Sequence, residues 1–136
     1  MRPFFVYGTL KRGQTNYARF LAGHTVSETR AWLSAAALYT AGPYPFLVRA
    51  ADLVPQNATV FGELIDVHPA RYQHILALLD ELEDYVPGRA DNLYERVELP
   101  VQTVDGTRSA WVYVAGAAVE AAIRRGELRL IERGEW

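Results

Sequence analysis

Apolar residues come in short runs along the chain, bounded by glycine, proline or polar residues. The first run, residues 4–7, ends at Gly8 and is followed by a polar loop with a second glycine, Gly13. A short apolar run bounded by such residues is typical of a buried strand. We therefore expect a central strand that brings the loop to a site, because glycines let backbone N–H groups approach a ligand closely.

The rest of the pattern predicts a mixture of strands and helices. Strands are expected over residues 25–39, 46–48, 60–67, 94–104 and 107–115. Helices are expected over residues 16–22, 70–82 and 117–125, the last ended by Gly126. Asp105-Gly106 predicts a hairpin, because a type I′ turn favours residues that accept a positive φ. A mixed sheet or a small barrel with two helices fits this order, and the strands alone leave both open.

Composition narrows the class of protein without identifying a function. The chain has 136 residues, of which 50% are hydrophobic and 22% charged, so we expect a single globular domain over residues 1–136. The formal net charge of −2 argues against nucleic-acid binding, and the absence of cysteine excludes thiol catalysis. No apolar run approaches the roughly 18 residues of a membrane span. A soluble, cytoplasmic protein with no membrane partner is therefore expected.

One acidic residue, Glu83, falls on the apolar side of the helix predicted from residue 70. At about 100° per residue, the apolar arc is formed by Tyr72, Ile75, Leu76, Leu79 and Leu82. Glu83 lies about 40° from Leu79, inside that arc, if the helix continues past Leu82. A carboxyl buried there would have a raised pKa and would suit general acid–base chemistry. The alternative is that the helix ends at Leu82 and Glu83 is solvated, and the pattern leaves both open.

Other candidate chemistry is weaker. Residues 8–15 differ by one residue from a phosphate-binding P-loop, because Gln14 stands where that loop needs its lysine. The histidines lack the spacing of metal ligands, so no metal site is expected. Tyr7 and Tyr113 each lie near the end of an apolar strand, where a tyrosine hydroxyl can face a pocket.

Five segments that span nearly the whole chain carry a resemblance to a known family. They are residues 5–14, residues 42–48, residues 60–64, residues 79–83 with 94–96, and residues 110–114. The most specific are Phe-Val-Tyr-Gly-Thr-Leu at 5–10 and Leu-Asp-Glu-Leu-Glu at 79–83, the latter followed by Tyr-Glu-Arg. Together they resemble the gamma-glutamylcyclotransferase superfamily, including its gamma-glutamylamine cyclotransferase and avirulence-induced-gene-like branches.

The resemblance implies a fold, a reaction and a set of site residues. The fold would be α+β, with a small mixed sheet closing into a barrel-like core and two flanking helices. The reaction would be intramolecular aminolysis of a γ-glutamyl amide, which releases 5-oxoproline and a free amine and needs no cofactor. Glu83 looks like the family's catalytic glutamate. The residues expected to bind substrate are Tyr7, Gly8, Thr9, Leu10, Tyr44 and Tyr113.

Two other classes of function stay open. One is a noncatalytic small-molecule-binding module of the same fold. The other is an interaction protein that uses Trp136 and the helix carrying Arg124 and Arg125 as a contact surface. The expected partner is a small γ-glutamyl substrate, and the oligomeric state is left open. Arg96 is expected to be structural, paired with a carboxylate of a loop.

Overall fold

The structure is a computed structural model that describes residues 1–136. One group of strands is β1 (Phe4–Val6), β2 (Thr25–Ser34), β5 (Thr59–Val67), β6 (Tyr94–Thr103) and β7 (Gly106–Ala115). A second group is β3 (Ala37–Thr40), β4 (Pro45–Val48) and β8 (Arg129–Ile131). The α-helices are α1 (Tyr72–Leu82) and α2 (Ala117–Arg124).

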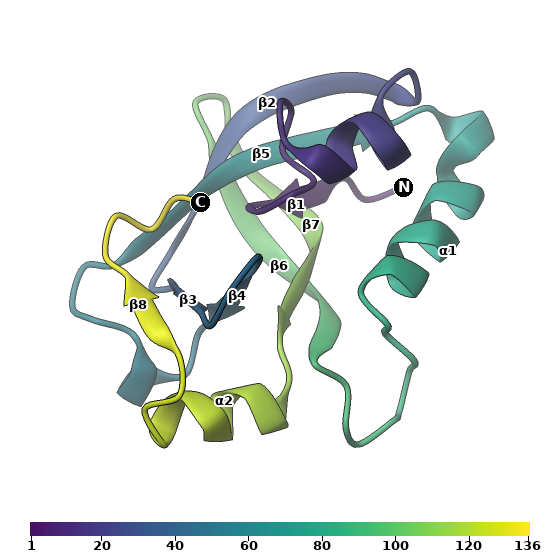
Figure 1. Cartoon of the computed structure of the whole chain (residues 1–136). Helices are drawn as coiled ribbons and strands as arrows, with labels where there is room; N and C mark the ends of the chain where they lie inside the picture. The colour runs from purple at the N-terminus through teal and green to yellow at the C-terminus, as the bar shows by residue number, and fades with distance from the viewer.

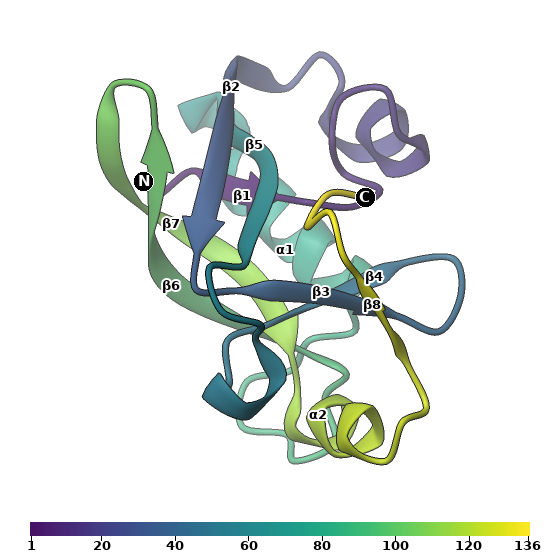
Figure 2. The same cartoon turned by 90° about the vertical axis from the view of Figure 1, so that its left-hand side faces the viewer.

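The first group closes into a barrel in the order β1-β5-β2-β6-β7, and the second forms a smaller sheet in the order β4-β3-β8. Helix α1 lies beside the barrel, whereas α2 lies at the opposite end of the molecule, below the smaller sheet (Figures 1 and 2). This confirms the α+β fold with a barrel-like sheet and flanking helices, and it decides between an open sheet and a closed barrel. No helix has the length and apolarity needed to cross a membrane.

Strand β1 closes the barrel. It pairs antiparallel with β5 and, through Phe4 and Trp111, parallel with β7. The approach of β1 to β5 is so close that a Cβ on Gly62 would lie 2.3 Å from the Val6 carbonyl oxygen. Only glycine fits there, because no side-chain carbon can approach a backbone oxygen at that distance.

Alternate residues of β1 point to opposite faces of the sheet and join different cores. Phe4 and Val6 pack in a cluster that includes Ile75 and Leu79 of α1. Phe5 and Tyr7 join a second cluster that contains no α-helical residue. The strand is therefore buried on both faces, which explains its unbroken apolar sequence.

The chain between residues 25 and 39 does not form the one strand expected from its sequence. It divides into β2 in the barrel and β3 in the smaller sheet. The break falls at Ala35, whose φ of 54 turns the chain out of the barrel while its N–H donates to the Ala58 carbonyl at 3.0 Å. A run of small apolar residues carries no signal for such a turn, because only the packing around it holds alanine in this conformation.

The hairpin of β6 and β7 forms as expected, but its turn is centred one residue earlier. Thr103 pairs with Gly106, so the turn residues are Val104 and Asp105, and neither has a positive φ. The type I′ prediction was therefore wrong. The Thr103 hydroxyl accepts from the Asp105 N–H at 3.1 Å and donates to the Gly106 carbonyl at 3.0 Å, so this side chain closes the turn.

Candidate active site

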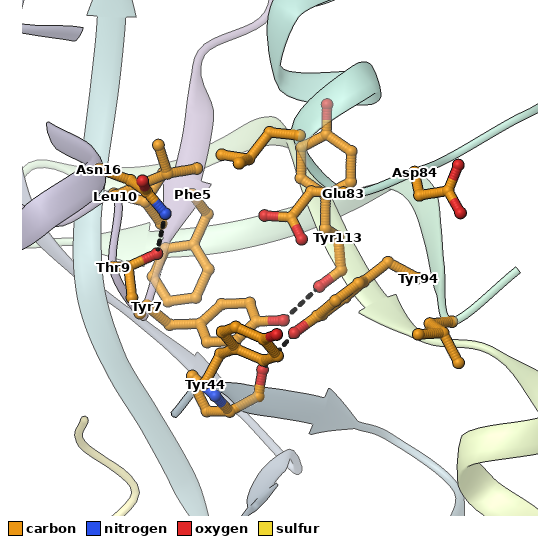
Figure 3. A pocket seen from close by; sticks show the side chains of 15 residues that line it. Phe5, Tyr7, Thr9, Leu10, Asn16, Tyr44, Glu83, Asp84, Tyr94 and Tyr113 are labelled. Atoms are coloured by element: carbon orange, nitrogen blue, oxygen red, sulfur yellow. Dashed lines mark hydrogen bonds between the residues drawn. The ribbon is translucent and has the colours of Figure 1, made fainter. Parts of the chain in front are cut away.

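A pocket of about 300 Å³ lies where β1 ends. Its walls come from the loop after β1, the start of β4, the end of α1, the start of β6 and the end of β7. The expected site residues all line it: Tyr7, Gly8, Thr9, Leu10, Tyr44, Glu83 and Tyr113. Figure 3 shows Thr9 and Leu10 on one wall and Glu83 on the other. Segments far apart in the sequence thus meet around one cavity.

The loop after β1 lines this pocket and contains main-chain donors without a partner. The N–H groups of Gly8, Thr9 and Leu10 donate to no acceptor within the protein. Partly buried amides without a partner are rare, because each loses hydrogen bonds to water without a replacement. Consecutive free N–H groups form a concave site for an anion or a developing negative charge.

Contacts with Asn16 and with β5 hold the loop in this shape. The Asn16 side-chain amide donates to the Thr9 hydroxyl at 2.7 Å, and the Asn16 N–H donates to the Thr9 carbonyl at 2.9 Å. The Arg12 N–H donates to the Glu63 carboxylate at 2.6 Å, which ties the loop to β5. The Thr9 carbonyl and hydroxyl are therefore engaged, while the N–H groups of Gly8 to Leu10 have no partner.

Glu83 follows the last residue of α1 and still points inward. Its N–H donates to the Leu79 carbonyl at 3.0 Å, as it would in a continuing helix. Asp84 then adopts a φ of 50, and the chain turns away. The helix thus ends at Leu82, as one of the two alternatives predicted. The solvated position for Glu83 that belonged to this alternative is wrong, because the helical hydrogen bond at Glu83 keeps its side chain directed into the pocket.

The Glu83 carboxylate has no hydrogen-bond donor and no cation as a partner among the contacts of the protein. The neighbouring hydroxyls do not serve it: Tyr7 donates to the Tyr113 carbonyl, and Tyr94 donates to the Pro45 carbonyl at 2.8 Å. Figure 3 shows both hydroxyls turned to those carbonyls below the Glu83 carboxylate. Burial without a hydrogen-bond donor or a cation to stabilise the charge raises the pKa of Glu83 to about 7.

The same charge acts on the tyrosines. Burial, followed by the Glu83 carboxylate and then Tyr44, raises the pKa of Tyr94. The Tyr94 ring is held by stacking on Phe46 of β4, with ring centroids 4.6 Å apart. Tyr94 therefore stays neutral near pH 7 and, with Phe46, forms a rigid, weakly polar wall beside Glu83.

Tyr113 is engaged by a group on α1. Its hydroxyl donates to Asp80 at 2.6 Å, and Arg96 of β6 binds the same carboxylate through Nε at 2.8 Å and Nη2 at 3.2 Å. Arg96 is therefore paired, as expected, but with a helix residue and not with a loop carboxylate. At about 100° per residue Asp80 lies outside the apolar arc of the helix, so the sequence pattern favours a solvated position for it. The pattern could not indicate the partners from β6 and β7 that bind its carboxylate.

The mouth of the pocket is apolar, and its charged residues are acidic. Tyr44 and Leu93 line the opening with 53% and 51% of their surfaces exposed. Glu83 and Asp84 are the charged residues of the lining, and no lysine, arginine or histidine takes part in it. The chain holds no group of three or more residues arranged to bind a metal ion. The pocket thus carries negative charge opposite a set of neutral amide donors.

Sequence reasoning did not single out some residues of the site. Tyr94 and Asn16 line the pocket, and Asp80 orders Tyr113 from behind it. Tyr94 opens a strand directly after a long loop, a position from which a hydroxyl can reach a site, so this signal was present in the sequence. Asn16 and Asp80 carry no such signal, because their roles depend on which segments lie opposite them.

This architecture defines a class of protein, a small α+β barrel with a pocket of ligand size where the first strand ends. The particular family follows from sequence. The family model described as "Gamma-glutamyl cyclotransferase, AIG2-like" matches residues 4–136, and the chain belongs to this family.

Individual relatives agree with this assignment. The chain is 33% identical to gamma-L-glutamyl-butirosin B gamma-glutamyl cyclotransferase from Niallia circulans, over 84% of this chain and 67% of the relative. It is 32% identical to gamma-glutamylaminecyclotransferase from Bos taurus, over 83% of this chain and 65% of the relative. The matched region thus spans about two thirds of these relatives. An AIG2-like protein from Mus musculus has a similar crystal structure, with a TM-score of 0.72, 25% identity, and coverage of 100% of this chain and 88% of that protein.

Proposed function

We propose that this protein is a γ-glutamyl cyclotransferase that acts, as a single domain, by intramolecular aminolysis of a γ-glutamyl amide. The α-amine of the substrate attacks its own γ-carbonyl carbon, and a ring C–N bond forms while the amide C–N bond breaks. The products are 5-oxoproline and a free amine. Because the substrate supplies the nucleophile, the protein has to orient the chain and move protons, and orientation alone can supply about 7–11 kcal/mol.

In this mechanism Glu83 is the general acid–base. Its carboxylate takes one proton from the α-ammonium group and delivers it to the leaving nitrogen. It then takes the second proton that the ring nitrogen loses, and this proton passes to the released amine, which departs as an ammonium ion. The N–H groups of Gly8 to Leu10 bind substrate oxygens, including the oxyanion that develops at the γ-carbonyl. One donor of this kind is worth roughly 3–4 kcal/mol of transition-state stabilisation.

One observation carries this proposal: an uncompensated carboxylate with a pKa of about 7 shares a pocket with a row of free main-chain donors. A carboxyl that titrates near neutrality exchanges protons in both directions at working pH. The names of the bacterial and bovine relatives, which specify γ-glutamyl compounds, support the choice of substrate.

The first test is turnover of γ-glutamyl amides with detection of 5-oxoproline. Wild-type protein should release 5-oxoproline, and Glu83→Gln should lower kcat by about 10²–10⁴, because it keeps the shape and removes the base. Glu81→Gln, an exposed neighbour on the same helix, is the matched control and should retain full activity. A Glu83→Gln variant with near wild-type kcat contradicts the role of Glu83. Binding of the amides without any turnover would favour the noncatalytic module.

The acidic lining also favours one class of leaving group. The Glu83 carboxylate would repel a carboxylate next to the scissile amide, whereas a neutral or cationic amine meets no such repulsion. We propose that the preferred substrates are γ-glutamyl amides of amines that lack an α-carboxylate.

A comparison of two substrates checks this preference. The value of kcat/KM should be at least about tenfold higher for γ-glutamyl-butylamine than for γ-glutamylalanine, a difference of about 1.4 kcal/mol. Equal values of kcat/KM in wild-type protein would contradict the electrostatic explanation.

A further inference from the structure

Residues 132–136 follow β8 and form a strap that lies against β5. The Gly134 N–H donates to the Ile131 carbonyl at 3.0 Å, and the Gly134 carbonyl accepts from the Phe61 N–H of β5 at 2.8 Å. A Cβ on Gly134 would lie 1.9 Å from the Thr59 carbonyl oxygen. The strap therefore runs in direct contact with the backbone of this strand.

The strap also reaches the loop that follows β1. The Lys11 ammonium group donates to the Trp136 carbonyl at 2.8 Å, in a partly buried position. In Figures 1 and 2 the end of the strap lies beside this loop. A hydrogen bond from a charged donor is roughly twice as strong as one between neutral groups. The strap is thus attached to the loop as well as to the barrel.

Lys11 closes the turn that contains the partnerless amides. Its N–H donates to the Gly8 carbonyl at 3.0 Å, so Gly8 to Lys11 form a β-turn with Thr9 and Leu10 at its centre. The first three of these residues line the pocket, whereas Lys11 does not. The contact between Lys11 and the strap therefore acts on the shape of the turn and not on a bound ligand.

The other contacts of this loop do not involve the strap. The Arg12 N–H donates to the Glu63 carboxylate at 2.6 Å, and the Asn16 side chain donates to the Thr9 hydroxyl at 2.7 Å. Loss of the Lys11 contact alone should therefore loosen the turn and leave the fold intact.

We propose that Lys11 is a positioning residue, which the strap holds through the Trp136 carbonyl so that the N–H groups of Gly8 to Leu10 keep one arrangement. Donors that are held in place stabilise a developing charge because they need no reorganisation during the reaction. The use of this arrangement in catalysis rests on the proposed function, whereas the effect of the strap on the turn does not.

The first test measures the loop amides in the absence of substrate. Backbone nitrogen NMR relaxation should give order parameters of about 0.85 for Gly8 to Leu10 in wild-type protein, as in rigid backbone. Lys11→Met removes the donor and should lower them towards about 0.6, near the range of flexible backbone. Lys11→Arg supplies a cationic donor again and should keep the wild-type values. Arg133→Met, which removes an exposed charge from the strap itself, is the control and should also keep them.

A substitution in the strap removes the same contact from the other side. Gly134→Ala places a methyl carbon against the Thr59 carbonyl and should displace the strap from β5. It should loosen the amides as Lys11→Met does, and the double variant should be no looser than either single variant, because both changes remove one interaction. Additive effects, or rigid amides in Lys11→Met, overturn the proposal. If Gly134→Ala does not fold, Lys11→Met and its rescue by arginine decide.

Turnover separates this inference from the proposed function. Lys11→Met should lower kcat/KM about tenfold, less than the 10²–10³ expected when such a donor is removed outright, and Lys11→Arg should recover it. Loosened amides without turnover of any γ-glutamyl amide would support the role of the strap and refute the reaction. Turnover by a Lys11→Met variant whose amides stay rigid would do the reverse.

Discussion

At the scale of single residues, the unusual feature is a carboxyl whose surroundings withhold every partner. Tyr7 and Tyr94 lie beside Glu83, yet each hydroxyl gives its proton to a backbone carbonyl. A satisfied carboxylate has a normal or lowered pKa, and this one has a pKa raised to about 7 by burial. Ionisation of Glu83 therefore lowers the stability of the folded protein, and this is the residue that the proposed reaction uses as its acid–base group.

Stability should reveal this ionisation. Below the unfolded pKa, near 4.5, Glu83 is neutral in both states; between that value and about 7 only the folded state keeps the proton, so rising pH costs stability. Glu83→Gln removes the cost. Relative to wild type, its free energy of unfolding should increase by about 1–3 kcal/mol between pH 4 and pH 8, measured by urea denaturation.

Glu81→Gln is the control for that measurement. Glu81 is exposed, so its replacement should change the difference between the two pH values by less than about 0.5 kcal/mol. A Glu83→Gln variant that gains nothing at pH 8 would show that the carboxylate is solvated when ionised.

At the scale of elements, the end of α1 decides where Glu83 points. The last helical hydrogen bond is donated by the Glu83 N–H, and Asp84 leaves the helix with a φ of 50. The loop of residues 86–92 returns the chain to β6, and the Asn92 side chain closes it by bonding the Val86 N–H at 3.2 Å and the Val86 carbonyl at 2.8 Å. The direction of Glu83 is thus fixed by the way the helix stops.

A substitution at the helix exit tests this. Asp84→Val should destabilise the fold by about 1–2 kcal/mol, because a β-branched residue is strained in the left-handed region. Asp84→Asn is the control, since asparagine accepts this conformation, and it should stay within about 0.5 kcal/mol of wild type. Urea unfolding measures both variants. Equal stability of the two would mean that the left-handed turn is not maintained in solution.

At the scale of the whole molecule, closure of the barrel brings the two halves of the site together. The free amides follow β1, and β1 pairs with both β5 and β7. Helix α1 packs on the outward-pointing residues of β1, which places its end across the pocket from those amides (Figure 1). The site therefore depends on a close approach between two backbones, made possible at Gly62.

Gly62→Ala tests this dependence. Its methyl carbon would lie 2.3 Å from the Val6 carbonyl oxygen, which a backbone held on both sides cannot vacate. We expect a loss of about 3 kcal/mol or more, beyond ordinary overpacking, or a failure to fold. Gly42→Ala, where a Cβ meets nothing within 4 Å, should be nearly neutral. Thermal unfolding compares the two, and a stable Gly62→Ala variant would refute so close an approach.

The parts of the fold that depend on residues close together in the sequence could be predicted from it. Periodicity, proline and glycine predict the buried first strand, the hairpin of β6 and β7, and the helix after Pro69 with its apolar side. The division of residues 25–39 at Ala35 and the turn at Val104 did not follow, since contacts with distant segments determine them. The partner of Arg96 could not be predicted for the same reason.

The sequence by itself determined which groups are available: a glycine-containing loop after a buried strand and a glutamate beside an apolar helix face. Local patterns carry this information because they depend on neighbours along the chain. Only the tertiary structure decided that the loop amides stay free, that the nearby phenols bond elsewhere and that Asp80 holds Arg96. These are relations between segments far apart in the sequence, and the burial that raises the pKa of Glu83 likewise comes from segments that only folding brings around it.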